Sequence, residues 1–109
     1  KTTKGQNSVM HNHKNYYMSA ILYLQDDNRL IVENPFWDYQ HYLFPVYELS
    51  PYTCNSVMVA TPKNSILFLP AWLKHQIPPY DGEDPRYSIV MNFHPINQYG
   101  TETSRITVK

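Results

Sequence analysis

The sequence predicts an all-β domain, and three observations support this fold class. Aromatic residues make up 15% of the 109 residues, and nine prolines stand against three glycines. Aromatic side chains favour strands, whereas proline is typical of rigid turns and interrupts helices. Short segments with an apolar residue at every second position recur along the chain, separated by turn signals. We therefore expect a sandwich or barrel of short strands with little helix.

Eight segments combine this alternation with the β-branched and aromatic residues of strands. In chain order they are residues 18–24, 29–33, 43–49, 56–60, 65–69, 74–77, 86–93 and 105–108. Turn signals rich in Asp, Asn, Pro or Gly separate them, at residues 26–28, 34–35, 50–51, 61–64, 78–79 and 81–85. Residues 38–54 are the least regular and most aromatic part, and we expect a long, partly ordered loop over one mouth of a barrel.

Size and charge limit the function classes. A chain of 109 residues and 12.9 kDa fits one domain over residues 1–109. Nine Lys and Arg balance nine Asp and Glu, which makes nucleic acid the least favoured partner. No window approaches the roughly 20 apolar residues of a membrane helix. The single cysteine, Cys54, excludes an internal disulfide and a cysteine-based zinc site, so we expect a cytoplasmic protein.

The histidines carry the sharpest functional signal. His11 and His13 are two residues apart, so on an extended strand both imidazoles point to one face and can converge on a metal ion. Alone, this pair is as consistent with a surface or core pair as with a metal site. His75 follows the apolar run at residues 65–74, where a buried strand would bring a third imidazole to the same cavity.

Two further histidines are predicted to stay outside this site. His41 lies in the aromatic loop segment, where a solvated or stacking role is the more common one. His94 stands between a strand and Pro95, where a partly exposed strand end is the simpler interpretation.

Four motifs follow one another in a specific order: His11-x-His13, residues 19–24, residues 66–75 and residues 86–93. This ordered set resembles the iron(II)- and 2-oxoglutarate-dependent oxygenases over about residues 5–93. Within that superfamily the chain is most similar to small 2OG-Fe(II) oxygenases of bacteria and their phages, distant relatives of the prolyl hydroxylases. The resemblance implies a double-stranded β-helix, a jelly-roll or cupin-like barrel, which agrees with the strand pattern.

The resemblance also implies a catalytic metal site at His11, His13 and His75. His11 matches the first metal-binding histidine of the family and His75 the distal one. His13 departs from the family pattern, because most members have Asp or Glu at this place. Two interpretations remain open: His13 ligates and forms a three-histidine site, or it stands aside and water takes the position. The strand face of His13 favours ligation.

Cosubstrate binding is implied for Arg86, Ser88 and Tyr23. Arg86 matches the arginine that clamps the distal carboxylate of 2-oxoglutarate, and a guanidinium offers two parallel donors to such a group. Ser88 and Tyr23 match hydroxyls that add hydrogen bonds to that carboxylate. The alternative for Tyr23 is a core aromatic. For Arg86 it is a surface ion pair with Glu83 or Asp84, which we disfavour because the following strand has a buried pattern.

Taken together, the resemblance implies a hydroxylase that uses Fe(II) and 2-oxoglutarate and releases succinate and carbon dioxide. Its primary substrate is unidentified, and a peptide side chain or metabolite is favoured over nucleic acid. One alternative is a cupin-like three-histidine dioxygenase or isomerase without 2-oxoglutarate. The other is a catalytically inactive binding barrel. We expect Trp72 in the core or at the rim, packed against the metal-bearing turn, and Trp37 near a substrate entrance.

The chain has only ten residues before His11, whereas the family usually has more. We therefore expect a truncated barrel, the C-terminal core of a longer protein. A missing strand would leave an exposed edge, which favours a homodimer.

Overall fold

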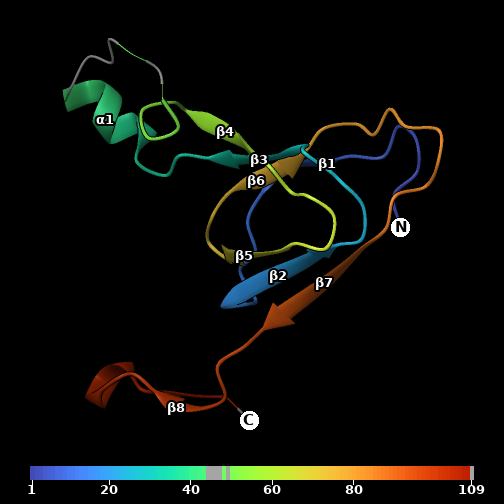
Figure 1. Ribbon diagram of the computed structural model, residues 1–109. Coiled ribbons are helices and arrows are strands. Elements are labelled where there is room, and N and C mark those ends of the chain that lie inside the picture. The colour runs from blue at the N-terminus through green and yellow to red at the C-terminus, as the bar shows by residue number, and fades with distance from the viewer. Residues whose placement is uncertain (44–47, 49, 109) are drawn as a thin grey trace.

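Two antiparallel sheets face each other in the computed structural model, which describes residues 1–43, 48 and 50–108 (Figure 1). The first sheet has the order β1 (Ser8–His11), β6 (His75–Ile77), β3 (Leu30–Glu33) and β4 (Ser56–Val59). The second has the order β5 (Ile66–Pro70), β2 (Met18–Tyr23) and β7 (Ser88–Phe93). A hairpin of β8 (Asn97–Tyr99) and β9 (Ile106–Val108), with a 3-10 turn at Glu102–Ser104 between them, lies apart from both sheets (Figure 1).

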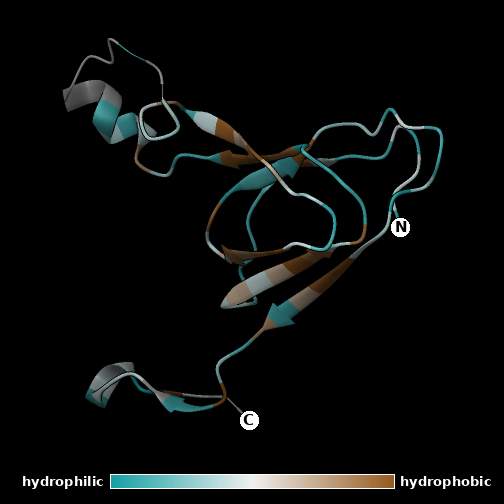
Figure 2. Cartoon of the chain, viewed as in Figure 1, coloured by the Kyte–Doolittle hydropathy of each residue, from teal (hydrophilic) through white to brown (hydrophobic). Residues whose placement is uncertain are grey.

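The hydrophobic core lies between the two sheets. Ile21 and Tyr23 of β2 and Leu69 of β5 face Leu30 and Val32 of β3, and all five side chains are buried. They belong to alternate positions of their strands, which is the pattern of a sheet with one face inward. Burying a side chain of this size stabilises the fold by about 1.5–3 kcal/mol. The apolar segments of both sheets are brown in Figure 2.

The outer face of the second sheet is also apolar, but it is exposed. It is formed by Ile66, Phe68, Ile89, Met91 and Phe93, which are between 37% and 58% exposed. The prediction that the strand after Arg86 is buried is therefore wrong. The reason is that β7 is an edge strand paired with β2 alone, and no described segment covers either of its faces.

Most expected strands are present within one or two residues of the predicted bounds. The expected segments 18–24, 29–33, 56–60, 65–69, 74–77, 86–93 and 105–108 correspond to β2, β3, β4, β5, β6, β7 and β9 in that order, with β5 beginning and ending one residue later than expected. The strand expected at 43–49 begins at the last residue of a helix, and most of the rest lies outside the described residues. The fold is thus mostly β with antiparallel sheets.

The helix α1 (Trp37–Leu43) corrects the expectation of a loop at this place. The Asn34 side chain accepts a hydrogen bond from the Phe36 N–H at 3.0 Å, and the Asn34 carbonyl accepts one from the Trp37 N–H at 3.2 Å. Asp38 lies in the first turn, where a carboxylate interacts favourably with the helix dipole. In the part of the chain that the structure describes, no helix is long and apolar enough to cross a membrane.

Candidate metal centre and buried arginine cluster

Three histidines converge at one end of the strand pair β1–β6. His11 ends β1, His75 begins β6, and the two residues lie directly opposite each other in the antiparallel register. His13 follows two residues after the end of β1, and its N–H donates to the Ala71 carbonyl at 2.8 Å. The ring centroids are 4.6 to 5.3 Å apart, and the ligand atoms of the three residues lie within 4.8 Å of one another.

Backbone carbonyls orient two of the three rings. The Nδ1 atom of His11 lies 2.7 Å from the Val9 carbonyl oxygen, and that of His75 lies 2.9 Å from the Leu73 carbonyl oxygen. A carbonyl oxygen only accepts hydrogen bonds, so we assign the proton of each neutral ring to Nδ1. The Nε2 lone pair is then free for a metal, as in many histidine metal sites.

The surroundings of His13 favour the neutral form that a metal ligand requires. Burial lowers the pKa of His13 below its ordinary value, and the nearby His11 and His75 lower it further. In the described residues the group contains no carboxylate, so three neutral imidazoles contribute no charge. Such a set suits a divalent transition metal such as iron, zinc, copper or nickel.

The prediction that His11 and His13 lie on one strand needs a correction, although the two rings do converge. The strand ends at His11, and His13 reaches the group through an extended segment tied to Ala71. His94 is exposed and stays outside the group, with its ring 5.5 Å from that of Tyr16. The position of the His41 side chain lies outside the description.

A second polar cluster surrounds Arg86, next to the core. Arg86 and Asp27 form a buried ion pair through Nη1 and Oδ2. Asp27 also accepts from Arg29 Nε at 2.9 Å, and the Arg29 guanidinium lies 4.6 Å from the centre of the Tyr80 ring. One carboxylate therefore stands between two guanidiniums, which leaves one positive charge. The partner of Arg86 is thus neither Glu83 nor Asp84, as the surface alternative required.

Three polar atoms beside this ion pair are buried and make no hydrogen bond of good geometry in the described structure, although the Tyr23 and Thr61 hydroxyls interact with each other. They are Arg86 Nε, Tyr23 Oη and Thr61 Oγ1. Burial raises the pKa of Tyr23, and the Arg86 charge, a side-chain hydrogen bond with Thr61 and the Arg29 charge offset part of this rise. Burial lowers the pKa of Arg86, and Tyr23 opposes this shift. Each of the three atoms carries a hydrogen to donate, so together they fit an anion.

Sequence reasoning missed two residues of this cluster. Asp27 and Thr61 both lie in turn signals, where Asp and Thr are common for local reasons. The Asp27 N–H donates to the Thr61 carbonyl at 3.0 Å, which joins the two turns. Ser88 begins β7 opposite Tyr23, half-buried, and its hydroxyl makes no hydrogen bond in the described part of the chain.

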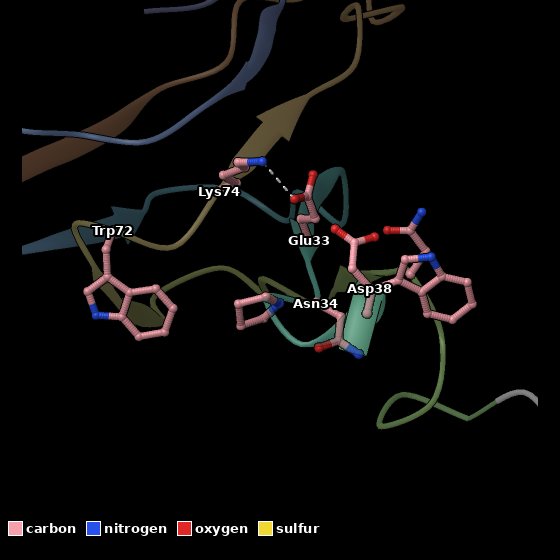
Figure 3. A pocket seen from close by; sticks show the side chains of 8 residues that line it. Glu33, Asn34, Asp38, Trp72 and Lys74 are labelled. Carbon is pink, nitrogen blue, oxygen red and sulfur yellow. Dashed lines mark hydrogen bonds and ion pairs between the residues drawn. The ribbon is translucent and has the colours of Figure 1, made fainter. Parts of the chain in front are cut away.

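Three cavities adjoin these clusters. Arg86 lines one of about 370 Å³ together with Ser8 and Ile77. The paired residues Ser8 and Ile77 lie three positions along β1 from the His11–His75 pair, about 10 Å at strand spacing. His13 lines a second cavity of about 490 Å³, and Trp72 lines both this cavity and a third of about 420 Å³. Figure 3 shows the third cavity from close by.

A comparison with protein families places these clusters within one match. The family model described as "Putative 2OG-Fe(II) oxygenase" matches residues 1–92. The matched part contains the three converging histidines and the whole Arg86 cluster, whereas the hairpin β8–β9 lies beyond it. No curated protein matches the chain.

Proposed function

The chain belongs to the 2OG-Fe(II) oxygenase family, and from this premise we propose an iron(II)- and 2-oxoglutarate-dependent dioxygenase that hydroxylates its substrate and releases succinate and carbon dioxide. The observation that carries this proposal is the convergence of His11, His13 and His75, with ligand atoms within 4.8 Å of one another. The family implies a double-stranded β-helix, and two facing antiparallel sheets are compatible with such a barrel.

The three histidines fit iron(II) chemically. Imidazole is a common iron ligand, and burial lowers the pKa of His13, which favours the neutral ring that binds a metal. The carbonyls of Val9 and Leu73 hold the His11 and His75 rings in fixed orientations. Bound iron and 2-oxoglutarate would supply the oxidation of a C–H bond with dioxygen as the oxidant, one oxygen atom going to the substrate and one to succinate, while the protein orients the substrate and excludes water.

The Arg86 cluster is our candidate for the distal carboxylate of 2-oxoglutarate. Asp27 takes the Nη1 side of the guanidinium and leaves Nε without a partner. A carboxylate there would accept hydrogen bonds from Arg86 Nε, Tyr23 Oη and Thr61 Oγ1, and would balance the excess positive charge of the cluster. Ser88 lies opposite Tyr23, which supports a further hydroxyl contact from this residue.

One observation favours a second candidate function, a cupin-like three-histidine dioxygenase or isomerase without 2-oxoglutarate. The metal group contains no carboxylate within the described residues, and Arg86 already has Asp27 as a carboxylate partner. In that case Arg86 would stabilise the fold and bind no cosubstrate.

An anaerobic titration with 2-oxoglutarate separates the two functions. The iron(II)-loaded protein is followed by the visible charge-transfer band that appears when a keto acid chelates iron. We expect the band in the wild type and a weaker cosubstrate affinity in Thr61→Val, which removes one buried donor without changing shape. The control is Thr107→Val in the hairpin. Metal binding without the band would contradict the proposal and favour the cupin-like function.

A further inference from the structure

A groove lies on the rim beside the metal centre, and the residues that line it have no role in the proposed oxidation. We call it the rim groove; its volume is about 420 Å³, and it is lined by Glu33, Asn34, Pro35, Trp37, Asp38, Asn55, Trp72 and Lys74 (Figure 3). This volume is within the usual range for sites that bind small molecules or single side chains.

The rim groove begins one residue away from a candidate metal ligand. Val32 lies directly opposite His75 in the β3–β6 pair, and the next residue, Glu33, lines the groove. The Glu33 N–H donates to the Lys74 carbonyl at 3.0 Å, which fixes the two walls relative to each other. Trp72 lines both the rim groove and the cavity that contains His13. Trp72 therefore stands between the rim groove and the cavity that His13 lines.

The charged groups of the rim groove have an acidic excess. Figure 3 shows the carboxylates of Glu33 and Asp38 on the same side, and Lys74 Nζ pairs with Glu33 at 3.0 Å. The Asp38 carboxylate makes no hydrogen bond or ion pair in the described part of the chain. One negative charge is therefore left without a partner in the groove.

The aromatic walls attract the same kind of ligand. An indole face binds a positive group through its quadrupole, and Trp72 is 59% exposed. Asn34 holds the opposite wall in place, because its Nδ2 donates to Gln40 Oε1 at 2.9 Å and to the Cys54 carbonyl at 3.1 Å. The first turn of α1, with Asp38, is thereby joined to the segment before β4.

We propose that the rim groove binds a positively charged amine or guanidinium of the primary substrate, next to the carbon that is oxidised. The substrate class is then a compound with a basic group, such as a peptide with a lysine or arginine residue or the free basic amino acid. Asp38 supplies the ion pair and Trp72 the cation–π contact. The role as a substrate groove rests on the proposed function, but binding of the cation does not require metal.

Intrinsic fluorescence gives a direct test, because Trp37 and Trp72 are the only two tryptophans and both line the groove. The metal-free protein is titrated with four capped tripeptides, Gly-X-Gly with X as Lys, Arg, Gln or Glu, and with free lysine and arginine. We expect saturable changes with the basic compounds, weakened by salt, and none with the Gln or Glu peptides. A preference for peptides over free amino acids would identify the source of the cation.

The matched variants are Asp38→Asn and Asp81→Asn, an exposed acid outside the groove. We expect Asp38→Asn to weaken binding of the Lys peptide at least tenfold and Asp81→Asn to leave it unchanged. Equal binding of the Lys and Gln peptides, absence of binding, or equal effects of the two variants would overturn the proposal. Because no metal is present, this outcome is independent of the charge-transfer band that tests the proposed function.

Discussion

Asp27 and Arg86 form an ion pair whose two side chains are only 4% and 7% exposed, although the residues are 59 positions apart in the chain. Asp27 also pairs with Arg29, which donates to the Pro78 carbonyl at 3.0 Å. This carboxylate is the only acidic partner of both arginines in the described ion pairs. It therefore holds Arg86 while leaving the cluster with an excess positive charge for an incoming anion.

Removing Asp27 is expected to destabilise the fold. Asp27→Ala would leave the Arg86 charge buried without a partner, and breaking such a pair costs about 3–5 kcal/mol. Urea unfolding followed by circular dichroism measures the change in free energy. Asp26→Ala is the matched control. Asp26 is the exposed neighbour of Asp27, and its carboxylate accepts only the backbone N–H of Lys63 in the described part of the chain. Similar losses in the two variants would mean that the buried pair contributes little.

Removing the Tyr23 hydroxyl is expected to separate stability from cosubstrate binding. The hydroxyl is buried and has only the weak contact with Thr61, so Tyr23→Phe should change the stability of the metal-free protein by no more than about 1 kcal/mol. The same variant should weaken 2-oxoglutarate binding about tenfold, the equivalent of one charge-assisted hydrogen bond. Thermal unfolding and the charge-transfer titration measure the two effects, with the exposed Tyr52→Phe as control. Unchanged affinity would assign Tyr23 to the core alone.

The role of His13 can be decided by metal affinity. His13→Ala should weaken binding of cobalt(II) or zinc at least tenfold, because one of three imidazole ligands is lost. His94→Ala is the control, since its ring lies outside the group. Competition with a chromophoric chelator measures both affinities. Wild-type affinity in His13→Ala would support the interpretation in which His13 stands aside and water takes its position.

The metal-free protein is expected to lose stability in mild acid through His13. Its folded-state pKa lies below the ordinary 6.5, so between these two values the unfolded chain binds more protons than the folded one. The stabilising contribution is therefore complete above pH 6.5 and is lost as the pH falls toward the folded-state pKa. Thermal unfolding from neutral to mildly acidic pH should show a smaller decline in His13→Gln than in the wild type. Equal declines would contradict this assignment.

Local patterns in the sequence were enough to predict most strands and the convergence of the histidines. The alternation in Leu30–Glu33 reflects one buried face, which a short window of sequence already contains. The spacing of His11 and His13 likewise brings both rings to one side over two residues. His75 also joins them, but by another route than expected, because the strand of the apolar run ends at Pro70 and His75 begins β6 in the other sheet.

Other features depended on contacts between distant segments, and only the tertiary structure decided them. Asp27 and Thr61 looked like ordinary turn residues until their two turns met beside Arg86. The strand Ser88–Phe93 has the composition of a buried strand, yet it is exposed because it stands at the edge of its sheet. Asp38 and Trp72 share a groove although α1 and the β5–β6 turn are far apart in the chain. A local pattern determines which face of a segment is apolar, but the partner of that face, or of a buried charge, depends on which segments the fold brings together.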